Sequence, residues 1–333
     1  MGIIKTFLLA AVLLPFLAVT SFAAGSGAYR LEVPDAGVAG KGSAFVGEAN
    51  RASAVYYNPA GLTQLQGQSV SLGVALIQPK VNYESNNGDK TKMQQESFLL
   101  PSLYYVTDLG TKNVALGIGT LTSWGLVTDW APDSFARYTT TRAEVSTQDY
   151  LITSAYKVNE QVSVGLGLVI NDAKVDKQKK LYQATGDGNF KLTGEDSGVG
   201  FVASGLYKIN ERHQFGLVYR SAIEHKYKGK VYLDDLNTTN VLDLDGNSVP
   251  ESSYSGVFGG ASYHTDVVSK STLPDNIVLG YSYKPNVKWT FNADIEWMNW
   301  SVVNKEELAY PEESNAARLA VLNNGNPASR DWA

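Results

Sequence analysis

The chain of 333 residues has no cysteine and few charged residues. Without cysteine there is no disulfide framework, so a small disulfide-stapled secreted scaffold is excluded. Charged residues make up 18% of the chain, whereas typical soluble proteins have roughly 25%. The formal net charge is -5 and no basic block occurs, which argues against nucleic-acid binding as the main role. Beyond the N-terminus no apolar run is long enough to cross a membrane as a helix, so any insertion must use strands.

The N-terminus has the pattern of a secretory signal peptide. Lys5 precedes an apolar run over residues 6–19, and residues 21–23 (Ser-Phe-Ala) offer the small side chains that signal peptidase reads. The alternative is an uncleaved membrane helix, but about 14 apolar residues fall short of the roughly 20 required, and Pro15 interrupts the run. We therefore predict export, with residues 1–23 as the signal peptide and cleavage after Ala23 or Ala24.

Alternating apolar and polar residues recur along the mature chain, which also has 19 tyrosines and 6 tryptophans. The alternation is clearest over residues 288–298, where one face is apolar and the other is polar or charged, and it recurs over 161–171 and 69–78. Weaker runs bring the expected total to about nine strands of a length that suits a tilted membrane strand. These runs lie at residues 98–107, 113–122, 147–157, 199–208, 213–224 and 276–283.

The connections between these segments favour an outer-membrane barrel over a secreted soluble β protein, which the alternation alone leaves open. Tight polar turns are expected at residues 108–112, 158–160, 209–212 and 284–287. Long links occur between them, around Asn86, Pro132, Gly186 and Asp245. Strict alternation of short and long links is typical of barrels with periplasmic turns and extracellular loops. The fold class expected is therefore all-β, an antiparallel transmembrane β-barrel.

An odd strand count conflicts with a complete barrel. Bacterial single-chain barrels have even strand numbers, and an open wall leaves unpaired backbone groups in lipid. The segment after Trp300 contains no further convincing strand. We therefore expect the sequence to be a C-terminal truncation of a longer chain.

Residues 36–65 form a segment that is rich in glycine and alanine and lacks strand alternation. Its sequence, AGVAGKGSAFVGEANRASAVYYNPAGLTQL, resembles the N-terminal hatch of the FadL/TodX family of outer-membrane transporters for hydrophobic compounds. Further blocks resemble that family in the same order. They are TSWGLVTDW at 122–130, SAYKVNEQVSVGLGL at 154–168, FGLVYRS at 215–221, LPDNIVLGYSYKP at 273–285 and DIEWMNWS at 294–301.

The resemblance implies a barrel of about fourteen strands, of which about nine are present, with a hatch folded inside the lumen. On this basis residues 24–66 are expected to form the hatch and residues 67–333 the incomplete barrel. The family is thought to release its ligand sideways through a gap beside a kinked third strand. The matching strand here is 113–130, with the kink at Ser123-Trp124-Gly125, because glycine tolerates a bulge.

The hatch motif Asn58-Pro59-Ala60-Gly61 is the expected gating element. A break in strand pairing leaves free N–H and C=O groups, and the Asn58 amide can supply both a donor and an acceptor for them. We therefore expect Asn58-Pro59-Ala60 to lie against the kink. The alternative is that the four residues form only a turn, since all four types favour turns.

The ligand expected is a hydrophobic small molecule, and a long-chain fatty acid and a monoaromatic hydrocarbon both remain open. A fatty acid needs an apolar groove and a cation for its carboxylate. Candidate cations are Arg137, Arg142 and Arg220, and Tyr29 and Leu31 are candidates for lining the apolar end. Further expected partners are outer-membrane lipid and lipopolysaccharide. We expect a monomer without a cofactor.

Three other functions receive less support from the sequence. An outer-membrane enzyme would need a catalytic group, but His213, His225 and His264 are the only histidines and no Gly-x-Ser-x-Gly elbow occurs. The loop at 243–247 hints at calcium, but the EF-hand ligand pattern fails. A porin would suit polar inward residues on 288–298. However, an open pore has no use for a hatch of some thirty residues.

Overall fold

The computed structural model describes residues 29–31, 34–183, 185–237, 240–242, 248–303 and 307–324. The predicted signal peptide and the loop at 243–247 lie outside these residues. Within them, most of the chain forms one 13-stranded antiparallel sheet, in which nine strands follow one another along a single path. These are β1 (Gln68–Ile77), β4 (Phe98–Thr107), β5 (Val114–Leu121), β7 (Arg142–Lys157), β8 (Val162–Tyr182), β9 (Asp187–Asn210), β10 (His213–Arg220), β15 (Asn276–Asn286) and β16 (Trp289–Met298).

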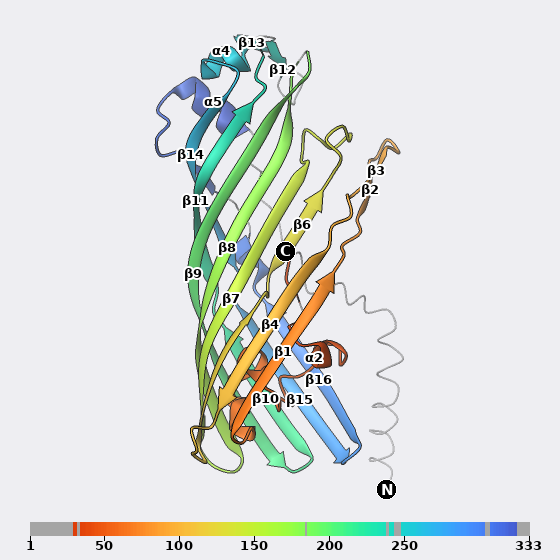
Figure 1. Ribbon diagram of the computed structural model, residues 1–333, viewed down its shortest axis with the longest axis vertical. Coiled ribbons are helices and arrows are strands. Elements are labelled where there is room, and N and C mark those ends of the chain that lie inside the picture. The colour runs from red at the N-terminus through yellow and green to blue at the C-terminus, as the bar shows by residue number, and fades with distance from the viewer. Residues whose placement is uncertain are drawn as a thin grey trace.

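The sheet curls into a tall open wall (Figure 1). Its edge strands are β1, which pairs with β4, and β16, which pairs with β15, and the described residues contain no pairing between the two edges. Nine strands therefore lie on the path, as the alternation predicts. Among the described residues, no helix is long and apolar enough to cross a membrane.

The outward face of the wall is apolar through its lower and middle part. Alternation places Leu72 on β1 and Ile295 on β16 outward, with 77% and 74% of their surface exposed. Exposed leucine, isoleucine and valine continue along β8 and β9. In water so much exposed apolar surface would be unfavourable, whereas facing lipid it is not.

Above this apolar band the wall continues as a narrower sheet, which we call the extension. β8 and β9 run for 21 and 24 residues, which is about twice the length expected from the sequence. β11 (Ile223–Asp234) pairs with the upper part of β9 and with β14 (Tyr263–Leu273), which in turn pairs with β17 (Glu307–Ala309). Two short helices, α4 (Tyr254–Phe258) and α5 (Ala316–Asn324), lie at this end (Figure 1).

This extension corrects the sequence prediction in two places. The expected strand at 213–224 is two strands, because β10 ends at Arg220 and pairs with β15, whereas β11 starts at Ile223 and pairs with β14. The long link around Asp245 includes β11 and β14 and is therefore largely sheet. The smaller elements are β2 (Asn82–Glu84), β3 (Lys90–Lys92), β12 (Asn240–Leu242), β13 (Ser248–Ser253) and η3 (Trp300–Val303).

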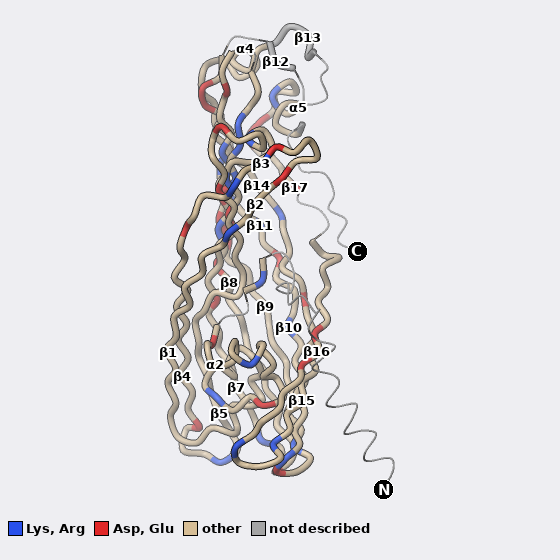
Figure 2. The backbone as a smooth tube through the Cα atoms, turned by 90° about the vertical axis from the view of Figure 1, so that its right-hand side faces the viewer, with Lys and Arg blue, Asp and Glu red and all other residues tan. Residues whose placement is uncertain are grey.

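The described part of the predicted hatch comprises residues 29–31 and 34–66, and residues 34–66 lie within the curl of the wall (Figure 2). It contains three short helical segments, α2 (Ala36–Ala39), α3 (Ala54–Tyr57) and η2 (Pro59–Gln64). Figure 2 places α2 between the β1–β4 side and the β15–β16 side. Small residues allow this close fit, since a Cβ on Gly165 of β8 would lie 2.4 Å from the Ala60 nitrogen.

Burial explains why the glycine- and alanine-rich segment folds without strands. Its apolar side chains form a core with inward-facing residues of the wall, and several are completely buried. Those from the hatch include Val38, Phe45, Ala54, Val55, Ala60 and Leu62, and those from the wall include Tyr104, Val106, Leu121, Leu151 and Leu206.

Candidate lateral opening and ligand cavities

The wall is interrupted between β4 and the strand that follows it. β5 ends at Leu121 and β6 (Gly125–Asp129) begins after three intervening residues, and both strands pair with β7. β4 pairs with β5 only from Leu103 to Thr107, so residues 98–102 of β4 pair with β1 alone. Between this part of β4 and β6, the described residues form no backbone ladder.

Contacts close the upper end of this gap. The Gln94 amide donates to the Asp129 carbonyl at 2.8 Å, and Met93 forms a bridge with Trp130. The Arg142 guanidinium lies beside them and bonds the carboxylates of Glu96, at 2.7 Å, and Asp129, at 2.9 Å. The gap is therefore a bounded window, with β-pairing below it and an ionic cluster above it.

Asp149 on β7 holds the kink at residues 122–124. Its carboxylate accepts hydrogen bonds from the Ser123 amide, at 3.2 Å, from the Ser123 hydroxyl and from the Asn171 amide. Asp149 is only 2% exposed. Thr147 adds a hydrogen bond to the Trp124 carbonyl at 2.8 Å. Polar side chains of the neighbouring strands thus fix the interruption at residues 122–124.

The N-terminal residues Tyr29–Leu31 pair with the kink. The Leu31 amide donates to the Ser123 carbonyl at 2.8 Å, and the Gly125 amide donates to the Tyr29 carbonyl at 2.7 Å. Arg30 and Trp124 form the antiparallel bridge between these two bonds. The backbone groups freed by the kink are therefore paired by the segment that precedes the hatch helices.

Contrary to the prediction, the Asn58 side chain forms no hydrogen bond with the kink among the described residues. The Asn58 amide donates to the Val46 carbonyl at 2.8 Å and accepts from the Ala60 amide at 3.1 Å. The Ala60 amide also reaches the Ser204 hydroxyl on β9 at 2.9 Å. Asn58 is completely buried. The motif is therefore a turn, the N-cap of η2, and it also fastens the hatch to β9.

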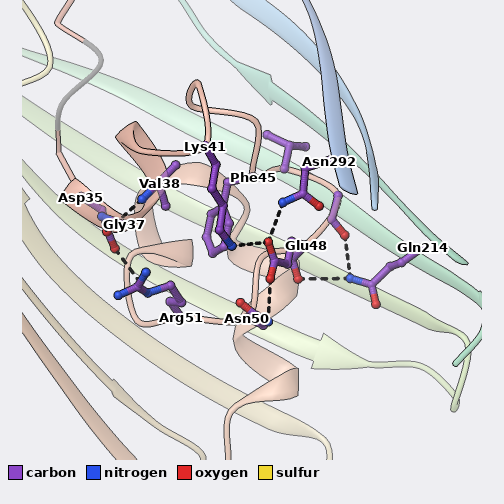
Figure 3. A network of polar contacts seen from close by, with 12 residues as sticks. Asp35, Gly37, Val38, Lys41, Phe45, Glu48, Asn50, Arg51, Gln214 and Asn292 are labelled. Atoms are coloured by element: carbon purple, nitrogen blue, oxygen red, sulfur yellow. Dashed lines mark hydrogen bonds and ion pairs between the residues drawn. The ribbon is translucent and has the colours of Figure 1, made fainter. Parts of the chain in front are cut away.

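A second set of contacts fastens the hatch to β10 and β16 (Figure 3). The Glu48 carboxylate accepts from Lys41 at 2.7 Å and from Asn292 on β16 at 2.6 Å. Gln214 on β10 donates to the carbonyls of Gly47, at 2.7 Å, and Glu48, at 3.2 Å. Burial raises the pKa of Glu48, but the hydrogen bonds from Lys41 and Asn292 outweigh burial and hold this pKa below its ordinary value.

Arg220 is the most unusual side chain inside the wall. One guanidinium nitrogen, Nη2, donates to the carbonyls of Tyr56, at 2.7 Å, and Tyr57, at 3.0 Å. The other, Nη1, is buried without a hydrogen-bond partner. It lines a cavity of about 50 Å³ whose other walls are mainly apolar. The apolar members include Tyr56, Trp124, Leu151, Val169, Phe201, Val202, Ile223 and Leu273, and the polar members include Arg30, Asp149 and Asn276.

Two further cavities adjoin this one. A cavity of about 200 Å³ on the hatch side shares Arg30, Tyr56 and Arg220 with it. A cavity of about 110 Å³ toward the extension shares Leu273 and is lined by Tyr29 and Lys177. The Tyr29 ring packs against Trp124 and Trp300 at centroid distances of 5.8 Å each. The three cavities thus form a row beside the kink, with Tyr29 along it.

The other predicted ligand residues separate into two groups. Tyr29 lines a cavity, and Leu31 packs on the kink, where a Cβ on Gly125 would lie 3.1 Å from its Cδ1. Arg137 instead pairs with Asp187 at 2.9 Å, and Arg142 belongs to the carboxylate cluster above the window. Neither of these two arginines lines any of the three cavities.

Sequence reasoning missed Asp149, Arg30 and Lys177. Asp149 had a weak signal, since it is a charged residue at an inward position of a predicted membrane strand. Arg30 pairs with Glu296 of β16, a contact that depends on how the N-terminal segment lies across the lumen. Lys177 belongs to the part of β8 that exceeds the expected strand length.

The histidines form no catalytic arrangement with an activated serine among the described hydrogen bonds. His213 stacks on Tyr283 at 4.7 Å on the wall, and His225 is buried with its Nδ1 3.2 Å from an Asp196 carboxylate oxygen. His264 is exposed on β14. Within the described residues, no cluster of three or more potential ligands is arranged to hold a metal ion.

Comparison with known proteins identifies relatives along most of the chain. The model of the family described as outer membrane protein transport protein (OMPP1/FadL/TodX) matches residues 16–320. The long-chain fatty acid transport protein of Escherichia coli O157:H7 is 24% identical over 335 residues, covering 89% of this chain and 72% of that protein. Outer membrane protein P1 of Haemophilus influenzae is also 24% identical, covering 88% and 71%.

Solved structures show the same architecture. A FadL homologue from Pseudomonas aeruginosa superimposes with a TM-score of 0.66 at 16% identity, covering 85% of this chain and 72% of that one. The toluene transporter TodX from P. putida gives a TM-score of 0.62 at 17% identity, covering 78% and 68%. These likenesses confirm the predicted all-β fold of FadL type.

Proposed function

The chain belongs to the OMPP1/FadL/TodX family of outer-membrane transport proteins for hydrophobic compounds, and on that premise we propose that it takes up long-chain fatty acids through the window beside β6. The family's relatives are transporters and channels, which argues against an enzyme. The proposal includes placement in the bacterial outer membrane after removal of residues 1–23. The observation that carries it is the buried, unpartnered Nη1 of Arg220 in a mainly apolar cavity.

Both the carboxylate and the alkyl chain of a fatty acid match this site. Its carboxylate would accept a charge-assisted hydrogen bond from Arg220 Nη1, which removes the cost of leaving a buried donor without a partner. Its alkyl chain would lie against the apolar walls that continue toward Tyr29 and Leu273. A monoaromatic hydrocarbon would fill apolar space equally well but would leave the arginine unsatisfied.

The window is closed in this conformation, and Tyr29–Leu31 is the element that would have to move. Two backbone hydrogen bonds hold it to the kink, the Tyr29 ring packs against Trp124 and Trp300, and Arg30 forms an ion pair with Glu296 of β16. Each backbone bond contributes only about 1 kcal/mol, so the segment can leave without unfolding the wall once the Arg30 ion pair also breaks. Its departure would join the cavities and expose the gap between β4 and β6.

The hatch has a fixed role in this mechanism. The Asn58 turn holds it to β9, while the hydrogen bond between Glu48 and Asn292 holds it to β16, three strands farther along the sheet. Filling the lumen below the cavities directs the ligand sideways and prevents free diffusion of ions. This distinguishes the protein from a general porin, which would conduct ions steadily.

The second candidate substrate is a monoaromatic hydrocarbon, because TodX of P. putida is described as a toluene transporter and shares this fold. Aromatic side chains around the window, Trp124, Trp300 and Tyr29, would suit such a ligand. Arg220 discriminates between the two candidates, since only the fatty acid has a group for it to bind.

Binding of oleate and toluene to the purified full chain tests the choice. Arg220→Met should weaken oleate binding by about 2 kcal/mol, roughly thirtyfold in Kd, and leave toluene binding nearly unchanged. Arg220→Lys should recover part of the loss, which separates charge from packing. Arg137→Met is the matched control and should bind oleate like the wild type. Tight toluene binding with no oleate binding would overturn the fatty-acid assignment.

A further inference from the structure

The outward face of the wall changes from apolar to charged at one level. On β8 the exposed residues run Val164, Leu166, Leu168 and Ile170, and the next outward positions are Asp172 and Lys174. On β9 the exposed Phe201 and Val199 give way to Ser197 and Glu195, and Asp172 and Ser197 are direct partners in the β8–β9 register. In a membrane this level marks the upper limit of the hydrocarbon region.

Five lysines lie on the outward face directly above this level, on three strands. We call them the lysine patch: Lys174 on β8, Lys226, Lys228 and Lys230 on β11, and Lys270 on β14. All five are exposed. Figure 2 shows charged residues gathered in this upper part of the wall, where β11 and β14 lie.

The ion pairs between the patch lysines and their neighbouring carboxylates are exposed to solvent. Glu195 lies 3.6 Å from Lys174, and both side chains are more than 70% exposed. Glu224 lies 3.6 Å from Lys226, and Asp266 lies 3.0 Å from Lys230. Exposed pairs of this kind contribute only about 0–1 kcal/mol to stability, so an anion that binds lysine more tightly can replace the carboxylates.

The patch also contains like charges placed side by side. Lys226 and Lys270 are direct partners in the antiparallel register of β11 and β14, an arrangement that destabilises a sheet. Neither Lys228 nor Lys270 forms an ion pair with another described residue, although Glu195 and Glu307 lie opposite them in the strand register. Lys174, Lys228 and Lys230 line a groove of about 420 Å³ across β7, β8, β9 and β11, together with the carboxylates of Glu144, Asp176 and Glu195. A ligand with several negative charges would relieve the repulsion between Lys226 and Lys270 and would compete with these carboxylates for the lysines.

From this placement we propose that the lysine patch binds the phosphate groups of the glycolipid in the outer leaflet, lipopolysaccharide. The inference rests on the proposed location in the outer membrane. The extension lies at the end of the wall away from the short turns, which is the extracellular end in such barrels. The patch begins two residues above the apolar band, which places it at the depth of the lipid headgroups. Lysine ammonium groups bind phosphate as point charges.

The test uses the purified full chain in detergent and two probes, lipid A with both phosphates and enzymatically dephosphorylated lipid A. The variant carries Lys226→Gln, Lys228→Gln and Lys270→Gln. Its matched control carries Lys80→Gln, Lys90→Gln and Lys92→Gln, which remove the same charge from exposed positions around β2 and β3. Unfolding midpoints verify that both variants fold.

The wild type should bind phosphorylated lipid A at least tenfold more tightly than the dephosphorylated form. The patch variant should lose most of this difference, because each basic residue near an anionic lipid surface contributes roughly a fivefold gain in affinity. The control variant should keep it, and added salt should reduce it. Equal affinity for the two probes, or an equal loss in both variants, would overturn the proposal.

Oleate binding, measured on the same samples, keeps this test separate from the transport proposal. If the patch acts as inferred, the patch variant loses lipid A affinity and binds oleate like the wild type. If oleate does not bind even to the wild type, the fatty-acid proposal fails, while the difference between the two lipid A probes still decides the role of the patch.

Discussion

Replacing Asp149 by alanine should release the kink and destabilise the protein strongly. The Asp149 carboxylate satisfies the amide and hydroxyl of Ser123 and the amide of Asn171, and Asn171 is completely buried. Each donor left without a partner costs about 1–3 kcal/mol. Removing the carboxylate also removes the desolvation cost of a buried charge, which offsets part of the loss. We expect a net decrease of about 3–5 kcal/mol in the free energy of unfolding.

Urea unfolding in lipid vesicles measures this decrease, and amide exchange at Ser123 locates it. Asp172→Ala is the matched control, because Asp172 is an exposed carboxylate on the neighbouring strand and its loss should change stability by no more than about 0.5 kcal/mol. In the Asp149 variant, exchange should accelerate at Ser123 and Gly125 more than at β9. Equal effects of the two substitutions on stability would refute the idea that Asp149 holds the kink.

Three further predictions concern the hatch and the window. Gly165→Ala should lower the free energy of unfolding by about 1–3 kcal/mol, because its Cβ would meet the hatch backbone at 2.4 Å, whereas Gly205→Ala meets nothing within 4 Å and should be neutral. The folded state holds the pKa of Glu48 below its ordinary value of 4.5, so the Glu48 contacts should stabilise the hatch fully above pH 4.5. This stabilisation should be lost as the pH falls through the lowered pKa. The free energy of unfolding should therefore fall less steeply with decreasing pH in Glu48→Gln than in the wild type. Arg142→Gln should loosen the upper end of the window and speed exchange of the Gln94 amide roughly tenfold, because charge-assisted bonds to Glu96 and Asp129 are lost.

Each of these three has a distinct contrary result. Similar unfolding curves for the two glycine variants would mean that the hatch does not lie tightly on β8. Parallel pH profiles for the wild type and Glu48→Gln would mean that Glu48 contributes no pH-dependent stability. Unchanged exchange at Gln94 in Arg142→Gln would show that backbone pairing alone closes the window.

The wall could be predicted from the sequence because its signal is local. Alternation with period two marks each membrane strand by itself, as over residues 288–298, where β16 forms. The length of β8 and β9 could not be predicted in this way. Above the lipid the outward face becomes charged, so the apolar alternation that defines a membrane strand ends while backbone pairing continues.

The sequence predicted a kink at residues 123–125, and β-pairing is interrupted between Leu121 and Gly125, but the partners of the freed backbone groups were not predicted. Asn58 had the right chemistry to satisfy them, but its side-chain hydrogen bonds go to Val46, Ala60 and Gly205. Tyr29 and Leu31 satisfy them with backbone atoms, which every residue has, so side-chain type gave no signal. Likewise, nothing in the sequence favoured one of the three candidate arginines over the others. Only the folded structure shows that Arg137 and Arg142 form ion pairs with carboxylates and that Arg220 lines a cavity.

Locking Tyr29–Leu31 to the kink tests the central claim of a lateral route most directly. The chain has no cysteine, so Arg30→Cys with Trp124→Cys introduces a single possible disulfide between the two residues that are direct partners in the antiparallel bridge. Uptake of labelled oleate by cells should stop when the pair is oxidised and return when it is reduced, while each single variant transports under both conditions. Equal uptake by the oxidised and reduced double variant, with the disulfide verified by mass spectrometry, would contradict a route through this window.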